Sequence, residues 1–229
     1  MRQLFAVWLG RVSYRPGFEL QQIVAQLRAE EKLADTLLLL EHDHVYTLGR
    51  RAPEEEILLD REALAERGIA VERTDRGGRV TYHGPGQLVG YPIVRLATAD
   101  LVGYVRSLER AMVEVCGDFG VDAGAVDGLT GIWCGDRKIG AIGIHVSRGV
   151  TTHGFALNVN TDLTMFNGIV PCGIVDRGVT SLSEILGGEV AMEDVVRATM
   201  KRVGESLGAF NVVETTAEEL GLEVQRVGS

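Results

Sequence analysis

The sequence is poor in two kinds of reactive side chain, cysteine and lysine. Its 229 residues include three cysteines, and lysine occurs only at positions 32, 138 and 201. The cysteines form no CxxC pair and no regular framework, which argues against a disulfide scaffold or a zinc site and favours a reducing cytoplasm. No HExxH or H-x-E spacing supplies metal ligands either. We therefore expect a protein that needs neither a metal nor a cofactor.

Long apolar runs and an excess of positive charge are also missing. The apolar run at the start is too short to span a membrane and lacks a small-residue cleavage site, so we expect no signal peptide. Acidic residues outnumber basic ones by 32 to 23, and the net charge is −9. A broad nucleic-acid surface needs clustered Lys and Arg. The sequence thus predicts a globular protein that binds neither nucleic acid nor a membrane.

Glycine, by contrast, is abundant. The chain has 29 glycines, nearly twice the usual share of about 7%. Many fall in two segments, RGGRVTYHGPGQLVG at 76–90 and KIGAIGIHVSRGVTTHG at 138–154. The first segment has neither the P-loop order nor the strand–helix context of a dinucleotide fingerprint. Because arginine, threonine, tyrosine and histidine alternate with its glycines, it is more typical of a ligand-holding loop than of a surface loop.

The apolar pattern predicts strands and helices in irregular alternation. Strands are expected over 5–9 and 36–40, in a hairpin over 131–146 with a Gly135–Asp136 turn, and over 150–159; helices are expected after Pro16, from Asp100 to Gly120 and over 192–207. The acidic run 54–56 is expected in a solvated loop or at a helix start. Because no βαβ rhythm is present, we predict an α+β fold with a largely antiparallel or mixed sheet packed with helices. A single domain over 1–229 is expected.

The three cysteines differ in their surroundings. Cys116 lies on the apolar stripe of a predicted helix, and Cys134 shares a strand face with Ile132, so we expect both to be packed. Cys172 follows no periodicity and stands between Pro171 and a glycine, where a bend is expected. From the residues alone, it is equally well interpreted as a buried filler at a chain reversal or as a nucleophile. A nucleophile needs a base or a cation that favours the thiolate.

Lysine and histidine are the candidate partners of such a thiol. Lys138 enters an apolar, glycine-rich strand, where partial desolvation lowers the pKa of an amine towards that of a usable base, whereas the neighbouring Arg137 stays protonated. His83 and His153 each precede a glycine, although a hydrogen-bonded wall residue is the commoner role for such a histidine. His145 lies in an alternating strand and is interpreted as a packed or surface residue.

Five segments together resemble the lipoyl(octanoyl) transferase family, which has the biotin/lipoate protein-ligase fold. They are HVYTLGRR at 44–51, RGGRVTYHGPGQLVGYPI at 76–93, GIWCGDRKIGAIGIHV at 131–146, TTHGFALNVNTDL at 151–163 and FNGIVPCGI at 166–174. The resemblance covers nearly the whole chain, except for the tail after Gly208. The cysteine motif in register with the lysine motif is its most specific part.

The resemblance implies a cytoplasmic acyltransferase with a Cys/Lys dyad. Cys172 is expected to attack the thioester of octanoyl-acyl carrier protein, with Lys138 as its activating residue, and an acceptor lysine then takes the octanoyl group as an amide. The acceptors implied are lipoyl domains of 2-oxoacid dehydrogenase complexes and the glycine cleavage H protein. The implied substrate pocket consists of Arg76, Gly77, Gly78, Arg79, Val80, Thr81, Tyr82, His83, Ala141, Ile142, Gly143, Gly154, Phe155 and Ala156.

Several alternatives remain open at this point. An ATP-dependent lipoate or biotin ligase shares the fold and a comparable lysine but does not require the cysteine. Two further possible functions are an amidotransferase that moves octanoyl groups between lipoyl domains and a non-catalytic module that binds acyl carrier protein. Lys138 either takes the thiol proton or pairs with the thiolate. Because acyl carrier proteins are acidic, we expect a local basic rim, made of Arg50, Arg51, Arg76, Arg79, Arg148 and Arg177.

Overall fold

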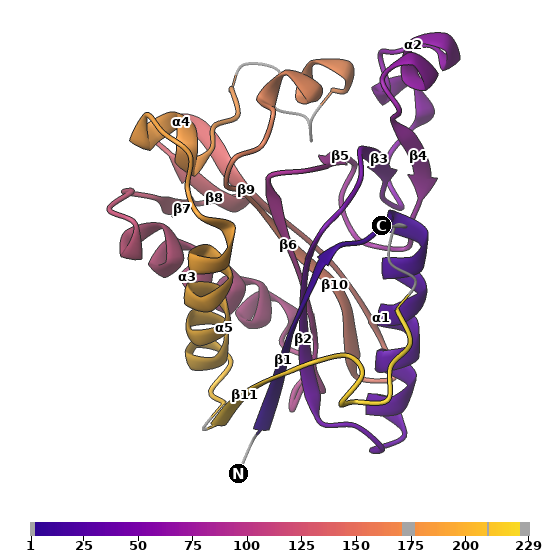
Figure 1. Ribbon diagram of the computed structural model, residues 1–229, viewed down its shortest axis with the longest axis vertical. Coiled ribbons are helices and arrows are strands. Elements are labelled where there is room, and N and C mark those ends of the chain that lie inside the picture. The colour runs from indigo at the N-terminus through magenta and orange to yellow at the C-terminus, as the bar shows by residue number, and fades with distance from the viewer. Residues whose placement is uncertain (1–2, 171–176, 210, 225–229) are drawn as a thin grey trace.

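A large mixed sheet forms the centre of the molecule (Figure 1). The computed structural model describes residues 3–170, 177–209 and 211–224. The eight strands lie in the order β11 (Asn211–Thr215), β1 (Gln3–Arg11), β2 (Asp35–Glu41), β6 (Gln87–Ile93), β10 (Val150–Asn158), β9 (Arg137–Ser147), β8 (Leu129–Cys134) and β7 (Gly124–Val126). Strand β1 is parallel to both of its neighbours, and the other pairs are antiparallel. The predicted α+β fold with a largely antiparallel sheet is confirmed.

Helices cover both faces of this sheet. Helices α3 (Leu101–Asp118) and α5 (Met192–Ser206) lie on one face, and α1 (Tyr14–Ala29) lies on the other (Figure 1). Strand β2 shows the consequence for the sequence, because Leu37 and Leu39 join the core beneath α3 and α5 while Leu38 and Leu40 join the core beneath α1. A strand buried on both faces needs a continuous apolar run rather than an alternating one.

The predicted helices and hairpin are confirmed, except that the first helix begins at Tyr14 and includes Pro16 in its first turn. Asp100 caps α3 as expected, since its carboxylate accepts a hydrogen bond of 2.8 Å from the backbone N–H of Gly103. Strands β8 and β9 form the expected hairpin, and Gly135 takes a positive φ of 60° in the turn between them. The hairpin carries Lys138 into the second residue of β9, at one end of the large sheet.

A smaller sheet with its own core adjoins the large one. Its strands are β4 (Ala70–Arg73), β3 (Val45–Leu48) and β5 (Val80–His83), and the short helices nearby are η1 (Glu54–Glu56), α2 (Arg61–Glu66) and η2 (Leu163–Gly168). The short helix α4 (Leu182–Leu186) lies beside the large sheet, where Leu182 joins the core beneath α3 and α5. The acidic run 54–56 forms η1, in agreement with the expected helix start, but Glu56 is 3% exposed and is therefore not solvated. Its carboxylate pairs with Arg79 and accepts from the backbone N–H of Val80 at 3.2 Å, so it fixes the start of β5.

Candidate active site

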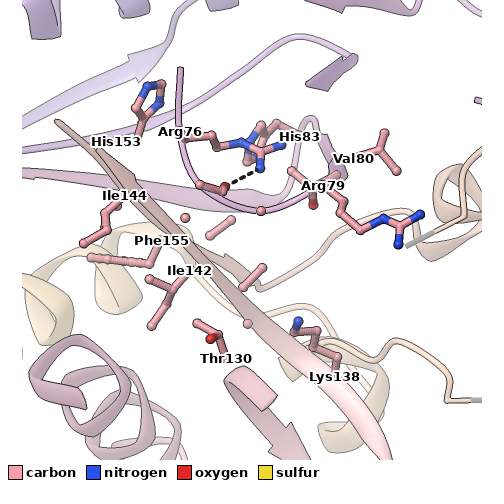
Figure 2. A pocket seen from close by; sticks show the side chains of 18 of the residues that line it. Arg76, Arg79, Val80, His83, Thr130, Lys138, Ile142, Ile144, His153 and Phe155 are labelled. Atoms are coloured by element: carbon pink, nitrogen blue, oxygen red, sulfur yellow. Dashed lines mark hydrogen bonds between the residues drawn. The ribbon is translucent and has the colours of Figure 1, made fainter. Parts of the chain in front are cut away.

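A cavity of about 600 Å³ lies where the small sheet meets one face of β6, β10 and β9 (Figure 2). It brings together, from the predicted site, Arg76, Gly77, Gly78, Arg79, Val80, Thr81, His83, Lys138, Ala141, Ile142, Gly143, Gly154, Phe155 and Ala156. Lys138 lies at one end of the view and His153 at the other. Segments that are separated in the sequence by more than 50 residues therefore line one pocket, as the glycine-rich motifs indicated.

The glycines permit a close approach between the two sheets. Gly77 donates its backbone N–H to the carbonyl of Ile144 on β9 at 2.9 Å. A Cβ atom on Gly143 would lie 3.0 Å from the carbonyl oxygen of Gly77, so a side chain here would push the loop away. With Ala141 and Ala156 beside it, this part of the sheet leaves a slot between the strands and the loop 76–79.

Arg76 is an internal tether of this loop. It is 7% exposed, and its Nη2 atom donates to the backbone carbonyl of Thr47 at 2.7 Å and to the Thr47 hydroxyl at 2.8 Å. The expectation that Arg76 contributes to a basic rim is therefore wrong, because its guanidinium is buried and hydrogen-bonded to Thr47 on strand β3. Of the other expected rim residues, Arg51, Arg79 and Arg177 line the cavity, whereas Arg50 and Arg148 are not part of its described lining. Arg148 lies in the turn between β9 and β10, so the expectation that it contributes to a rim around this cavity is wrong.

Lys138 is bound through its backbone to the segment that follows the cysteine motif. Its N–H donates to the carbonyl of Gly178 and its carbonyl accepts from Thr180, both at 2.9 Å. Its Nζ atom lies 5.1 Å from the ring centroid of Trp133, and the guanidinium carbon of Arg177 lies 5.5 Å from the same centroid. Both cations are thus within cation–π distance of the same aromatic ring.

Cys172 lies outside the described residues. Described residues on either side of 171–176 have defined anchors: Val170 donates its N–H to the carbonyl of Glu56 at 2.8 Å, and the carbonyl of Gly178 accepts from Lys138. The chain up to Val170 is thus attached beside the small sheet, and the chain at Gly178 is attached to the strand that carries Lys138.

A chain of side-chain amides determines the protonation of His83. Asn158 donates through Nδ2 to the backbone carbonyl of Thr180 at 2.9 Å, which leaves its Oδ1 as an acceptor for Gln87 Nε2 at 2.9 Å. Since Gln87 Nε2 also donates to a backbone carbonyl, that of Tyr82, its Oε1 must be the atom that lies 2.7 Å from His83 Nδ1. Carbonyl oxygens only accept hydrogen bonds, so Nδ1 of His83 carries the proton and Nε2 is an acceptor. Burial, together with His42 nearby, lowers the pKa of His83 to about 3 and keeps the ring neutral.

His153, which is buried, pairs with Asp75, which is partly exposed. The Nε2 atom of His153 lies 2.6 Å from the Asp75 carboxylate, and His145 lies 3.5 Å from the same carboxylate. His153 has a positive φ of 58°, and its backbone N–H donates to Gln21 at 2.7 Å. Burial lowers the pKa of His153, while the bond from His153 lowers that of Asp75. These contacts give His153 the wall position that the commoner interpretation predicts.

Tyr82, Cys116 and Cys134 are not part of the described lining of the cavity. Tyr82 is absent from the described lining, because its side chain on β5 points into the small core and its hydroxyl lies 2.8 Å from His44 Nδ1. Cys116 is fully buried, which raises the pKa of its thiol to about 12. Burial also raises the pKa of Cys134. Both thiols stay protonated near neutral pH and are poor nucleophiles.

The sequence reasoning missed several residues that line the cavity. Those with polar or aromatic side chains are Tyr14, Gln87, Tyr91, Thr130, Trp133, Asn158 and Phe166. Asn158 carried a usable signal, since it interrupts the apolar run FALNV at the end of a predicted strand. Within the described residues, no cluster of three His, Cys, Asp or Glu could hold a metal ion, and no helix is long and apolar enough to cross a bilayer.

Comparison with known proteins agrees with this architecture. The chain is 50% identical over 207 residues to an octanoyltransferase of Solibacter usitatus, covering 90% of each chain. Its fold is similar to that of a bipartite lipoate protein ligase of Thermoplasma acidophilum, with a TM-score of 0.75 at 21% identity over 94% of this chain and 87% of that one. A biotin protein ligase of Aquifex aeolicus gives a TM-score of 0.52 at 15% identity, over 92% and 71% of the two chains. Residues 13–204 match the model of the lipoyl protein ligase A/B catalytic domain, and the chain belongs to that family.

Proposed function

We propose that this protein transfers an octanoyl group from acyl carrier protein to a lysine of a lipoyl domain, through a thioester on Cys172. The observation that carries the proposal is the backbone pairing of Lys138 with Gly178 and Thr180, at the end of a slot with a small-residue floor. This pairing connects the lysine motif to the segment that follows the cysteine motif. The octanoyltransferase relatives support the same acyl group.

The first half-reaction forms the acyl-enzyme. The Cys172 thiolate attacks the carbonyl carbon of the octanoyl thioester, and Lys138 holds the proton that the thiol has lost. The bond to the carrier sulfur breaks, and the departing thiolate takes the proton from Lys138. One thioester replaces another, so this step needs no external energy source.

The second half-reaction releases the acyl group. The amine of the acceptor lysine attacks the Cys172 thioester, an amide forms, and the cysteine sulfur leaves with a proton from the amine. Conversion of a thioester to an amide runs downhill, which is consistent with transfer without ATP. Burial of about seven acyl carbons at about 0.8 kcal/mol each supplies several kcal/mol of binding to the slot.

The proposal extends to location and partners. We place the enzyme in the cytoplasm, as a single catalytic domain over 1–229. The acceptors are lipoyl domains of 2-oxoacid dehydrogenase complexes and the glycine cleavage H protein. The rival activity is that of an ATP-dependent lipoate or biotin ligase, which activates a free acid and has no need of a nucleophilic thiol. Transfer from the carrier without ATP separates the two.

Intact mass after incubation with octanoyl-acyl carrier protein tests the proposal. The wild-type protein is expected to gain one octanoyl group without ATP and to lose it when a lipoyl domain is added. Cys172→Ser is expected to lose both the adduct and the transfer. Cys116→Ser and Cys134→Ser are matched controls that retain both. Octanoyl mapped to Cys116 or Cys134, or a strict requirement for ATP, would contradict the proposal.

A further inference from the structure

Glu109 is a buried carboxylate with no obvious place in a hydrophobic core. It lies on the face of α3 that packs against the large sheet and is 1% exposed, whereas its buried neighbours on the helix, Leu108 and Met112, are apolar. A carboxylate in such surroundings is costly unless both oxygens have partners. Here Oε2 accepts from Arg106 at 2.6 Å, and Oε1 accepts from the backbone N–H of Gly131 on β8 at 2.9 Å.

Gly131 is the point at which this carboxylate meets the active site. Its φ of 114° belongs to the region that glycine alone adopts readily. A Cβ atom on Gly131 would lie 2.7 Å from Cε of Lys138 and 2.5 Å from the carbonyl oxygen of Gly140. The alkyl end of Lys138 therefore rests on the bare backbone of Gly131. Figure 2 shows Thr130, the residue before this glycine, at the same end of the pocket as Lys138.

We propose that Glu109 is a positioning residue for Lys138, acting through the backbone of Gly131. The Glu109 carboxylate holds the Gly131 N–H on the helix side of the sheet, which fixes the unusual backbone conformation against which Lys138 lies. The ring of Trp133 also contacts the lysine, with its centroid 5.1 Å from Nζ. This inference rests on the proposed function in one respect: Lys138 must be the group that carries the proton.

Limited chemical acetylation measures how accessible the Lys138 amine is, and it needs no octanoyl-acyl carrier protein. The chain has only Lys32 and Lys201 besides Lys138, and both are exposed internal standards. We expect Glu109→Leu, which removes the acceptor for Gly131, to raise the acetylation of Lys138 relative to that of Lys201. Glu109→Gln keeps an oxygen for the Gly131 N–H and is expected to restore the wild-type pattern. Glu114→Leu, an exposed position on the same helix, is the matched control.

Single-turnover acylation of Cys172 gives the second readout. Misplacement by a fraction of an ångström is expected to slow acylation in Glu109→Leu by about tenfold or more, and Glu109→Gln is expected to stay within about twofold of wild type. Gly131→Ala is expected to slow acylation as well. The double variant Glu109→Leu with Gly131→Ala is expected to be no slower than the slower single variant, because both substitutions disturb the same contact between Gly131 and Lys138.

Three results would overturn the proposed role of Glu109 or its route through Gly131. Unchanged acetylation of Lys138 in Glu109→Leu overturns the proposal, and so does equal disturbance in Glu109→Leu and Glu109→Gln, since charge rather than the hydrogen bond then acts. Fully additive effects in the double variant overturn the route through Gly131. A wild-type protein that is not acylated at all counts against the proposed function, whereas the acetylation pattern still decides the positioning role.

Discussion

The Oε1 atom of Gln87 lies 2.7 Å from the Nδ1 atom of His83, and this contact determines the tautomer of the ring. Because Gln87 donates elsewhere, it can only accept from His83. The network extends through Asn158 to Thr180, which is itself paired with Lys138. A neutral acceptor in the pocket wall is thus connected by hydrogen bonds to the strand that carries the proposed base.

Replacing Gln87 by Glu is expected to raise the pKa of His83 well above its wild-type value of about 3. A carboxylate at this position favours the charged imidazolium, since it places a negative charge against Nδ1–H. The NMR titration of the His83 ring measures the shift. Gln22→Glu, on the exposed face of α1, is the control for added charge. An unchanged His83 midpoint in Gln87→Glu would show that the amide does not set the protonation state.

Acid is expected to destabilise the protein before its carboxylates titrate. Burial lowers the pKa of His42 to about 4 and that of His83 to about 3, both from an ordinary value of 6.5. The unfolded chain therefore binds more protons than the native protein below pH 6.5, and stability falls as the pH falls. Each histidine contributes a slope of up to about 1.4 kcal/mol per pH unit.

Urea unfolding between pH 6.5 and 4.5 measures this slope. His42→Asn retains a donor for the carbonyl of Val12, which His42 Nδ1 contacts at 2.7 Å, but removes the titrating group. This variant is expected to reduce the pH dependence of the free energy of unfolding by the contribution of one histidine, up to about 1.4 kcal/mol per pH unit. A free energy of unfolding that stays flat across this range would contradict the burial of neutral rings.

Lys138→Arg is expected to slow both half-reactions by at least about 10²-fold, the lower range for loss of a general acid–base. Arginine keeps a positive charge but does not exchange a proton at working pH, and its larger planar group does not fit against Gly131. Single-turnover kinetics of acylation and of release, measured across pH, test this. Arg137→Lys is the neighbouring control, since Arg137 pairs with Glu184 at 2.8 Å outside the cavity lining that is described. Normal acylation by Lys138→Arg would leave Lys138 as a charge partner only.

Capture of an acidic carrier is expected to weaken as salt rises, although the chain is net negative. Arg51 and Arg177 are exposed and line the cavity, so Arg51→Gln and Arg177→Gln should each lower the association rate constant and flatten its salt dependence. Arg148→Gln, in the turn between β9 and β10, is expected to change neither quantity. Stopped-flow association at several salt concentrations makes the comparison. A salt profile that is flat in the wild type would exclude steering by these residues.

Local patterns predicted most of the elements but not the contacts between them. The β8–β9 hairpin followed from Gly135, and the start of α3 followed from Asp100, because both signals lie within a few residues of what they determine. Glu56 and Arg76 were misplaced because their burial depends on partners more than 20 residues away. The hydrogen bond from Gln87 to Asn158 likewise joins residues 71 positions apart in the sequence. The role of Cys172 stays a prediction, since it lies outside the described residues.

The parallel pairing of β11 with β1 has a consequence for biosynthesis. The strand made first, β1, pairs with β2 about thirty residues later, but the described partner of its other edge is the segment 211–215. Until those residues leave the ribosome, an apolar strand edge is open to pairing with other chains. Gly204 on α5 lies under Val212, so the helix and the last strand must arrive together. Nascent chains stalled before residue 211 are therefore the ones expected to depend most on chaperones.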